Sequence, residues 1–317
     1  MLPRPLAAAL AVLLALFVVA ACGGDDGEPA AAPPASSAAE QPAVDRFPVT
    51  VEAANGAVVL DERPDRIVSL SPTATESLFA IGAGEQVIAV DDQSNYPAEA
   101  PVTDLSGFQP NIEAIAGHDP DLVIAGFDPG GLVDGLAQVG VTVLLQPAAT
   151  DLEDAYEQIE ELGLATGNTA EAVELVTTMR GRIDDLVESA EGEGLSVYHE
   201  LGPDFFSATS QTFIGSVYEL LGLENIADEA GAKAPDYPQL SAEYIVSTNP
   251  DLIVLADTRC CGQTAEKLAA RPGWRQIGAV ADGHVVEADD DVASRWGPRT
   301  VDFVELVVQA LAEVGSR

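Results

Sequence analysis

The chain has 317 residues, enough for two domains of ordinary size, and 47% of them are apolar, which allows buried cores. It carries 52 acidic against 14 basic residues, a formal charge of −38. This excess of negative charge argues against nucleic acid or an anionic membrane surface as a partner of the folded part.

The N-terminal segment has the pattern of a secretion signal with a lipid-attachment site. An almost wholly apolar stretch runs to Ala21, as in a signal peptide over residues 1–21. Val19-Ala20-Ala21-Cys22 resembles a bacterial lipobox, and on that resemblance Cys22 carries a lipid after cleavage. A plain secretory signal and an uncleaved anchor helix are the alternatives. Residues 22–46 have the Ala, Pro, Ser, Gly and acidic composition of a disordered tether. The sequence therefore predicts an extracytoplasmic protein, lipid-anchored to the cell membrane.

Residues 47–166 are expected to form an N-terminal α/β lobe. Strands and helices alternate along this segment, which predicts a largely parallel sheet. Thr150-Asp151-Leu152-Glu153 has the pattern of a capping box that opens a helix, and the polar stretch 91–108 is expected to be a loop. The predicted strands lie at residues 66–70, 87–90, 122–125 and 141–145.

One stretch of this lobe recurs in the second half of the chain. Glu113 to Ala125 reads EAIAGHDPDLVIA and Glu243 to Leu255 reads EYIVSTNPDLIVL, an offset of 130 residues. In each copy a short helix stops before a proline, and a continuous apolar run follows, which is typical of a strand buried on both faces. Two similar αβ units within one large domain would be the simpler interpretation. The flanks also correspond, so we interpret the repeat as two lobes of the same fold facing each other.

Residues 167–193 are predicted to bridge the two lobes. Apolar residues recur at spacings of three and four from an Asn168 cap to about Ser189. This pattern predicts one amphipathic helix of roughly 20 residues, about 30 Å long. An ordinary surface helix is the alternative, but the length and position of the segment favour a strut between the lobes.

Residues 194–317 are expected to form the C-terminal lobe. Strands are predicted at 195–199, in the repeat and at 285–287, and a helix at 213–221. Arg295-Trp296-Gly297-Pro298-Arg299 is expected to open the final helix, with Pro298 in its first turn. The fold class is therefore α/β, with two Rossmann-like lobes joined by one long helix and a ligand cleft between them.

The sequence gives little support for catalysis or for a resident metal. It contains no G-x-S-x-G, P-loop or H-E-x-x-H motif, and its three histidines are scattered. We therefore expect a protein that is not an enzyme, without a bound cofactor or metal. His199 is the one histidine placed to reach a cleft as a ligand, although a hydrogen-bonded residue at a strand end is the preferred interpretation.

Aromatic residues in loops are more informative. Loops at the carboxyl ends of strands form the ligand side of open α/β sheets, so aromatic side chains next to Gly and Pro there are well placed to line a cleft. Each could instead be a local loop anchor. The expected ligand-binding residues are Tyr96, Phe108, Phe206, Tyr237 and Trp296, together with Arg295.

Cys260 and Cys261 are adjacent in the sequence. In an oxidising compartment they could form a vicinal disulfide, and a pair of free thiols is equally compatible with the sequence.

Several of these segments resemble a known family. Arg63 to Glu76, the Ser94-Asn95-Tyr96-Pro97 loop and both glutamate repeats resemble the substrate-binding lipoproteins of cobalamin and ferric-siderophore ABC importers. The resemblance extends over about residues 47–317. It implies the periplasmic-binding-protein fold with a single bridging helix and little closure of the cleft. It also implies that Glu113 and Glu243 dock onto arginines of an ABC permease, which works with its own ATPase. We expect the carrier to be a monomer.

The resemblance also narrows the ligand to a bulky metal chelate. Cobalamin binders of this class place aromatic residues on both sides of the cleft, where Phe108, Tyr237 and Tyr96 fall. Siderophore binders more often set arginines against anionic chelates, a role open to Arg295 and Arg299. Because the site has few cations, we favour a corrinoid such as vitamin B12 over a ferric siderophore. A haem or free metal-ion receptor is the alternative, and a secreted α/β enzyme is a weaker one.

Overall fold

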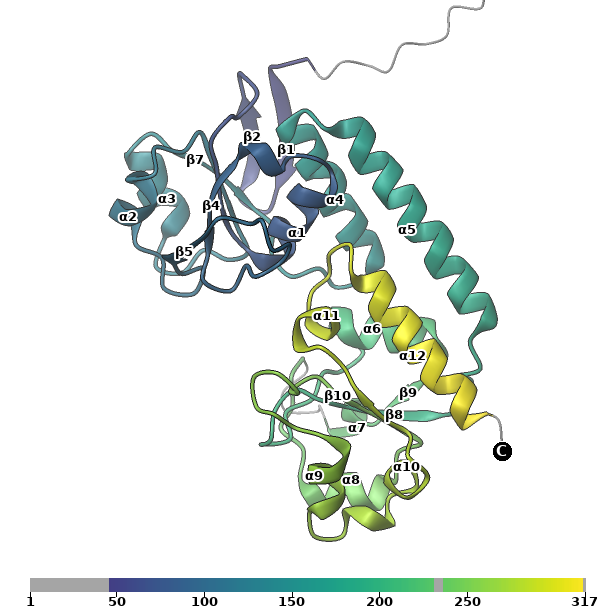
Figure 1. The fold of residues 1–317 in the computed structure, drawn as a ribbon. Coiled ribbons are helices and arrows are strands. Elements are labelled where there is room, and N and C mark those ends of the chain that lie inside the picture. Colours follow the sequence, from purple (N-terminus) through teal and green to yellow (C-terminus); the bar gives the residue numbers. More distant parts are fainter. Residues whose placement is uncertain (1–45, 231–235, 316–317) are drawn as a thin grey trace, which may run out of the picture. The chain divides into compact units, whose positions relative to one another are not determined.

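The computed structural model of the protein describes residues 46–230 and 236–315. The predicted signal peptide, Cys22 and nearly all of the predicted tether lie outside the described residues. Among the residues that are described, no helix is long and apolar enough to cross a membrane. The chain forms two α/β lobes, each built around its own parallel sheet, so the predicted fold class is confirmed (Figure 1).

The first lobe contains a five-stranded parallel sheet in the order β5-β4-β3-β6-β7. Its central strands β3 (Ile67–Leu70) and β6 (Leu122–Ala125) are buried along their whole length. The unbroken apolar run of β6 predicts this burial, whereas β3 includes the polar Ser69. The other strands are β4 (Val87–Asp91), β5 (Val102–Leu105) and β7 (Thr142–Leu145).

Two features of this lobe differ from the prediction. β5 lies within the segment expected to be a loop; as an edge strand it is half-exposed and polar, so it lacks the apolar run of a buried strand. An antiparallel hairpin, β1 (Val49–Ala53) and β2 (Gly56–Leu60), precedes β3 and was not predicted.

The helical segments of the first lobe are α1 (Pro72–Ala80), the 3-10 turn η1 (Gly84–Gln86), α2 (Ile112–Ala116), α3 (Leu132–Gln138) and α4 (Leu152–Thr166). Polar side chains cap α1, α2 and α4, whereas α3 and η1 begin without a side-chain cap. The cap of α4 lies one residue later than predicted. Asp151 accepts from the backbone N–H of Asp154, while Thr150 donates to the Asp154 carboxylate.

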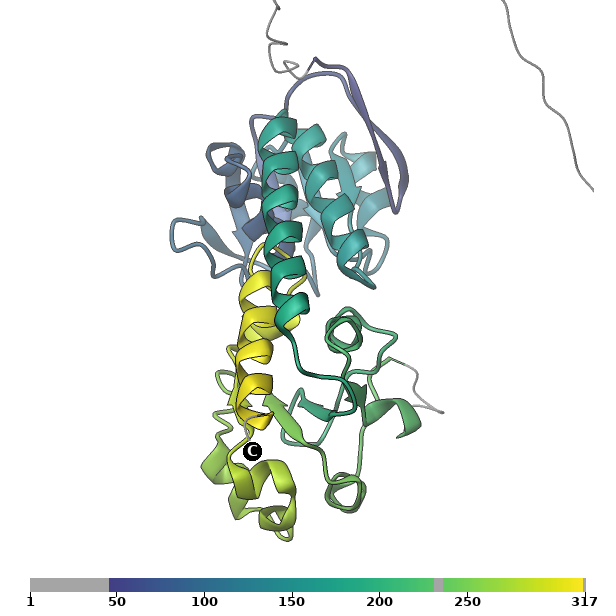
Figure 2. The same ribbon diagram turned by 90° about the vertical axis from the view of Figure 1, so that its right-hand side faces the viewer.

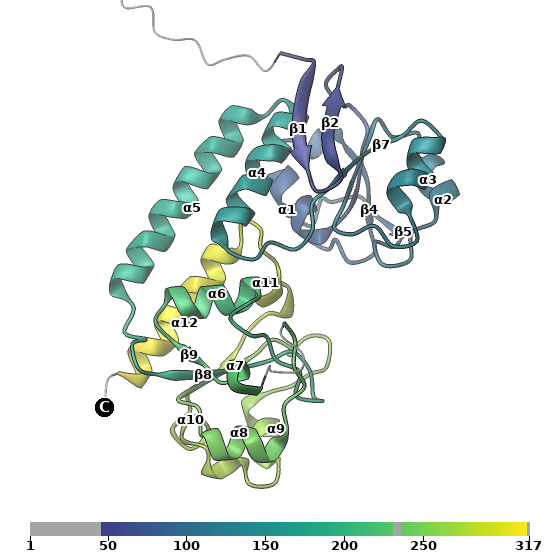
Figure 3. The ribbon, with the colours of Figure 1, turned by 180° about the vertical axis from the view of Figure 1, so that it is seen from behind.

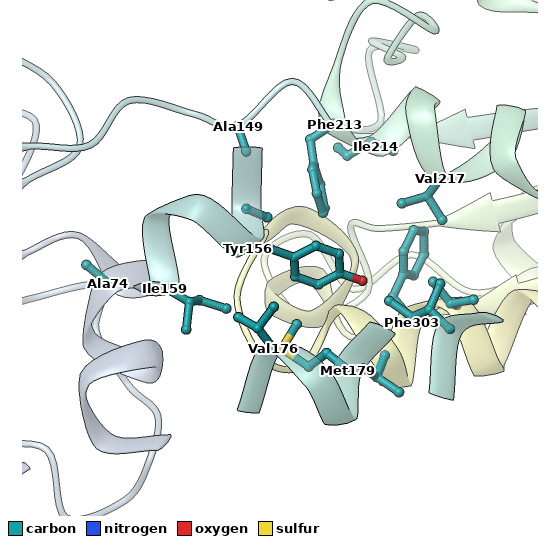
Figure 4. Packing of buried hydrophobic residues seen from close by; sticks show 14 of the residues in the cluster. Ala74, Ala149, Tyr156, Ile159, Val176, Met179, Phe213, Ile214, Val217 and Phe303 are labelled. Atoms are coloured by element: carbon teal, nitrogen blue, oxygen red, sulfur yellow. The ribbon is translucent and has the colours of Figure 1, made fainter. Parts of the chain in front are cut away.

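The predicted bridging helix is α5 (Thr169–Ser189), 21 residues long and about 31 Å in length. It runs alongside α4 and the final helix α12 (Thr300–Val314), as Figures 2 and 3 show. Its buried face forms part of a core that contains residues from both halves of the chain. In Figure 4, Tyr156 of α4 lies among Val176 and Met179 of α5 and Phe213 of the second lobe.

The second lobe contains a four-stranded parallel sheet in the order β11-β10-β8-β9. The strands are β8 (Ser196–Glu200), β9 (Glu224–Asn225), β10 (Leu252–Leu255) and β11 (Val285–Glu287). The helical segments around it are α6 (Phe213–Leu220), α7 (Ala227–Ala230), α8 (Ala242–Thr248), α9 (Ala265–Ala270), η3 (Trp274–Gln276), α10 (Gly278–Asp282) and α11 (Asp290–Ser294).

The start of the final helix differs from the prediction. α12 begins at Thr300 with Arg299 as its N-cap, so Pro298 lies before the helix instead of in its first turn. Residues 295–299 form a turn between α11 and α12, and this turn presents side chains to the first lobe.

The sequence repeat corresponds to a repeated structural unit, as predicted. Asp119 and Asn249, each just before the proline, both have left-handed backbones, with φ of 52° and 55°. The next aspartate in each copy caps the chain beside it. Asp121 accepts from the backbone N–H of Arg66 before β3, and Asp251 accepts from that of Ser196 in β8. The Pro-Asp pair therefore aligns two neighbouring strands in each lobe.

Candidate ligand site

Exposed aromatic side chains lie on loops that follow the carboxyl ends of the parallel strands. Tyr96, Phe108 and Phe127 follow β4, β5 and β6 in the first lobe, and Phe206 follows β8 in the second. Phe108 is the most exposed of them, at 65%. Such exposure of large apolar side chains on one edge of the sheets is characteristic of a binding surface.

Phe108 and Phe127 belong to one pocket of about 290 Å³ in the structure. Their rings lie 5.2 Å apart between centroids, at an angle of 34°. A Cβ at Gly107 would lie 2.6 Å from the Leu70 carbonyl oxygen, so only glycine lets the Phe108 loop approach β3 this closely. Besides the two phenylalanines, the pocket is lined by Leu70, Ser71, Pro72, Thr73, Asp91, Gln93, Gly107, Gly126, Arg295 and Trp296.

Phe127 was not predicted as a site residue. The available signal was its position two residues after the repeat strand, where the chain leaves β6 for the ligand side of the sheet. The corresponding position after β10 is Asp257, so the repeat offers no aromatic counterpart.

Trp296 reaches this pocket from the turn before α12. Its indole N–H donates to Oε1 of Gln158 in α4 over 2.9 Å, and the Gln158 amide in turn donates to the Pro147 carbonyl. These bonds fix the plane of the indole, which leaves its apolar part available to line the pocket.

The two arginines proposed as ligand contacts are already paired with acids. Arg299 donates to both carboxylate oxygens of the buried Glu76, over 2.8 and 2.6 Å, and Arg295 donates to Glu76 over 2.7 Å and to Asp291 over 2.7 Å. The hydrogen-bonded Glu76 carboxylate raises the pKa of Arg299. Arg295 still lines the pocket, but neither guanidinium is left as a free cation. Sequence reasoning missed Glu76 because it stands in an otherwise ordinary helix.

Tyr96 does not line the pocket of Phe108 and Phe127. It lines a separate hollow of about 260 Å³ together with Glu76, Phe79 and Arg299. The Arg299 guanidinium carbon lies 4.3 Å from the centre of the Tyr96 ring, a cation–π contact. Tyr96 therefore also supports the Glu76–arginine cluster.

Phe206 and Tyr237 are brought together in the second lobe. Phe206 forms an antiparallel bridge with Gln239, and Thr209 donates to the Asp236 carbonyl, so the two segments run side by side. Phe206 and Tyr237 are 43% and 49% exposed. Partial burial, with Asp236 nearby, raises the pKa of the Tyr237 phenol. The neighbouring Phe205 instead stacks on Trp274 and is a local anchor.

His199 is directed into the core of the second lobe. Its Nδ1 lies 2.6 Å from the Tyr218 hydroxyl, while its buried Nε2 has no hydrogen-bond partner. Burial lowers the pKa of this imidazole to about 3. It therefore does not reach the ligand side as a metal ligand would. Within residues 46–230 and 236–315, no group of three or more His, Cys, Asp or Glu residues could hold a metal ion.

Glu113 and Glu243 occupy equivalent, exposed positions. Each is the second residue of its helix, α2 or α8, after a capping residue, Asn111 or Ser241, that accepts from a backbone N–H in the first turn. Carboxylates in the first turn are favoured by the helix dipole, so this position stabilises the helix while it presents a negative charge to the solvent.

Cys260 and Cys261 form a vicinal disulfide, one of the two alternatives that the sequence left open. They lie on an exposed loop after β10, and the Cys260 backbone N–H donates to the Asp290 carboxylate over 2.7 Å.

Comparison with known proteins agrees with this architecture. Residues 67–292 match the family described as periplasmic binding protein. The chain is 32% identical over 278 residues to the uncharacterized ABC transporter substrate-binding lipoprotein YvrC of Bacillus subtilis, covering 84% of this chain and 86% of that protein. It is 35% identical over 270 residues to a cobalamin-binding protein of Halobacterium salinarum, covering 81% and 72%. The crystal structure of the periplasmic vitamin B12 binding protein BtuF of Vibrio cholerae superimposes with a TM-score of 0.66 at 26% identity, covering 80% and 99%. The chain belongs to the periplasmic binding protein family.

Proposed function

We propose that this protein is the substrate-binding lipoprotein of an ABC importer, and that it captures a corrinoid such as vitamin B12 for delivery to the permease. The family is one of binding proteins, and two of the similar proteins are named for cobalamin or vitamin B12. The observation that carries the proposal is the pocket of Phe108, Phe127 and Trp296, in which the adjacent arginine is already paired.

A corrinoid matches the chemistry of this pocket. Its macrocycle is large and nearly neutral, so stacked aromatic faces can cover it without a compensating charge. An anionic ferric siderophore would need a free cation, and Arg295 and Arg299 could provide one only by leaving the buried Glu76. Phe206 and Tyr237 would contact the ligand from the second lobe, and Tyr96 from the rim.

In the proposed carrier, residues 1–21 act as the signal peptide and Cys22 as the lipid-attachment site. Cleavage before Cys22 and lipidation of its thiol would tether the lobes to the outer side of the cell membrane through residues 23–46. Support comes from the lipobox-like sequence and from the name of the Bacillus subtilis relative, a lipoprotein. The proposed lobes are residues 47–166 and 194–317, with residues 167–193 as the bridge. Glu113 and Glu243, one on each lobe, would dock onto basic residues of the permease.

The test is binding of cyanocobalamin to the full chain, followed by gel filtration and visible absorption, with haem and a ferric hydroxamate in parallel. We expect the corrinoid colour to co-elute with the protein. Phe108→Ala with Phe127→Ala should weaken binding, whereas the matched control Val59→Ala, on the exposed hairpin, should not. Co-elution of haem or the ferric chelate without the corrinoid would reject the corrinoid assignment while leaving the carrier class in place.

A further inference from the structure

Two buried acids lie side by side at the carboxyl edge of the second sheet. Glu200 is the last residue of β8, and its register partner is Leu255, the last residue of β10. Ala256 donates its backbone N–H to the Glu200 carbonyl over 2.9 Å, so Asp257 follows directly beside Glu200. Both Glu200 and Asp257 are 0% exposed. Two carboxyl groups are thus enclosed at one point of the fold.

One arginine, Arg271, lies near this pair of acids, and it is hydrogen-bonded to only one of them. Arg271 donates to both oxygens of Glu200 over 2.6 Å, and the Tyr198 hydroxyl donates to Glu200 over 3.1 Å. The guanidinium is held between Phe205 and Trp274, with its carbon 5.2 and 4.6 Å from the ring centres. Neither oxygen of Asp257 has a hydrogen-bond partner.

The titratable groups that face Asp257 are Glu200 and Tyr198 on β8, Arg271 after α9 and Asp290 on α11. The Glu200 and Asp290 carboxylates oppose ionisation of Asp257, and the Arg271 guanidinium favours it. Burial and then the Glu200 carboxylate raise the pKa of Asp257 to about 7. Burying an ionised carboxylate without a hydrogen-bond donor costs free energy, whereas a protonated Asp257 can donate its own O–H to Glu200.

Asp257 also begins the loop that carries the vicinal disulfide. Its carbonyl oxygen accepts from the Gln263 backbone N–H over 3.2 Å, which closes residues 257–263 into a loop. The Asp290 carboxylate binds the middle of this loop through the backbone N–H groups of Arg259 and Cys260, over 2.9 and 2.7 Å. Asp290 is also one of the negative charges that oppose ionisation of Asp257.

We propose that Asp257 and Glu200 hold one proton between them, and that loss of this proton loosens the loop of residues 257–263, which makes the loop a pH-sensitive element of the second lobe. The proton sits on Asp257 as the donor of a hydrogen bond to Glu200. When it leaves for solvent, two buried carboxylates face a single guanidinium, and Asp257 and Asp290 repel each other across the loop. The inference concerns this lobe and does not depend on which ligand the protein carries.

Hydrogen exchange of the full chain tests the proposal. The amides of Cys260 and Gln263 should lose protection, after correction for intrinsic exchange rates, by roughly fivefold or more as the pH rises from about 6 to about 8. The infrared carbonyl band of a protonated carboxylic acid should disappear over the same interval. Absence of that band in the wild-type protein near pH 6 would overturn the proposal without any variant.

Amide variants assign the effect to the pair. Asp257→Asn and Glu200→Gln each remove one of the two negative charges, so each should abolish the pH-dependent step in loop protection. Glu266→Gln, on the exposed side of α9 in the same lobe, is the matched control and should retain the step. Retention of the wild-type step in either amide variant would contradict a proton shared by this pair.

Discussion

The two lobes repeat the same helix, Pro-Asp turn and buried strand, yet they neutralise their buried acids differently. In the first lobe, the buried Glu76 is bound by two arginines from the turn before α12, and the buried Asp91 accepts from the Ser94 hydroxyl. In the second lobe, two buried acids, Glu200 and Asp257, lie near one arginine, Arg271, which binds only Glu200. Each buried acid of the first lobe therefore has a hydrogen-bond donor of its own, whereas Asp257 of the second lobe has none.

This difference separates two physical roles. A carboxylate bound by two guanidinium groups, one of them bidentate, fixes the elements that it joins, here α1 and the turn before α12. A carboxyl group with no partner of its own remains titratable. The first edge is thus suited to holding a ligand pocket in shape, and the second to responding to pH.

The largest effect, loss of uptake, is expected on changing the glutamate that the two lobes have in common, Glu113 in the first and Glu243 in the second. Glu113→Arg combined with Glu243→Arg should abolish uptake in cells, since both proposed docking charges are reversed, and should leave corrinoid affinity unchanged, since neither residue lines the pocket. Uptake of labelled cobalamin and binding by the purified chain measure the two effects. Glu85→Arg with Glu266→Arg, two exposed acids elsewhere on the lobes, is the control for net charge. Normal uptake by the docking variant would remove the symmetric assignment.

Glu76→Gln tests how much the Glu76–arginine cluster stabilises the first lobe. It removes the carboxylate of two largely buried guanidinium groups, of which Arg295 keeps Asp291 and Arg299 keeps none that binds it in the structure, so we expect the free energy of unfolding to fall by about 3 kcal/mol. Denaturant unfolding measures this loss, with the exposed Glu85→Gln as a control that should change little. A loss no larger than that of the control would mean that the cluster contributes no net stability.

Asp257→Asn should raise the free energy of unfolding at pH 8, whereas Glu76→Gln should lower it. In the wild-type protein the folded state keeps a proton on Asp257 up to about pH 7, while the unfolded state loses it near pH 4. The stability that this group contributes is therefore complete at low pH and is lost as the pH rises to about 7. The variant should exceed the wild type in unfolding free energy by about 2 kcal/mol at pH 8, and the difference should shrink toward pH 4. A difference independent of pH would contradict the raised pKa.

The smallest effect is expected for single aromatic residues of the proposed site. Phe108→Ala in the first lobe and Tyr237→Ala in the second should each weaken corrinoid binding by about 1 kcal/mol, roughly fivefold. Titration of visible absorption or tryptophan fluorescence measures the affinity. Because both side chains are exposed, unfolding free energies should stay near the wild-type value. An effect confined to Phe108 would place the ligand on the first lobe alone.

Much of the fold could be predicted from the sequence because its signals are local. The apolar runs of β6 and β10 and the repeated Pro-Asp turns identify the two lobes directly. Elements without such signals were missed, as the polar edge strand β5 shows. The exposed aromatics could be proposed from their loops, but the pairing of Glu76 with Arg295 and Arg299 spans more than 200 residues and depends on the tertiary fold.

His199 and Asp257 of the second lobe both have strongly shifted pKa values, in opposite directions relative to proton binding. The folded state keeps His199 unprotonated down to about pH 3 and keeps Asp257 protonated up to about pH 7. Between about pH 4 and about pH 6.5 an unfolded chain would place its one proton on the histidine, and the folded chain places it on the aspartate. Both states then bind the same number of protons at these two groups, so together they contribute no slope of stability against pH in that interval. A lobe with two strongly perturbed residues is thereby buffered against mild acid, and each residue alone would make it sensitive.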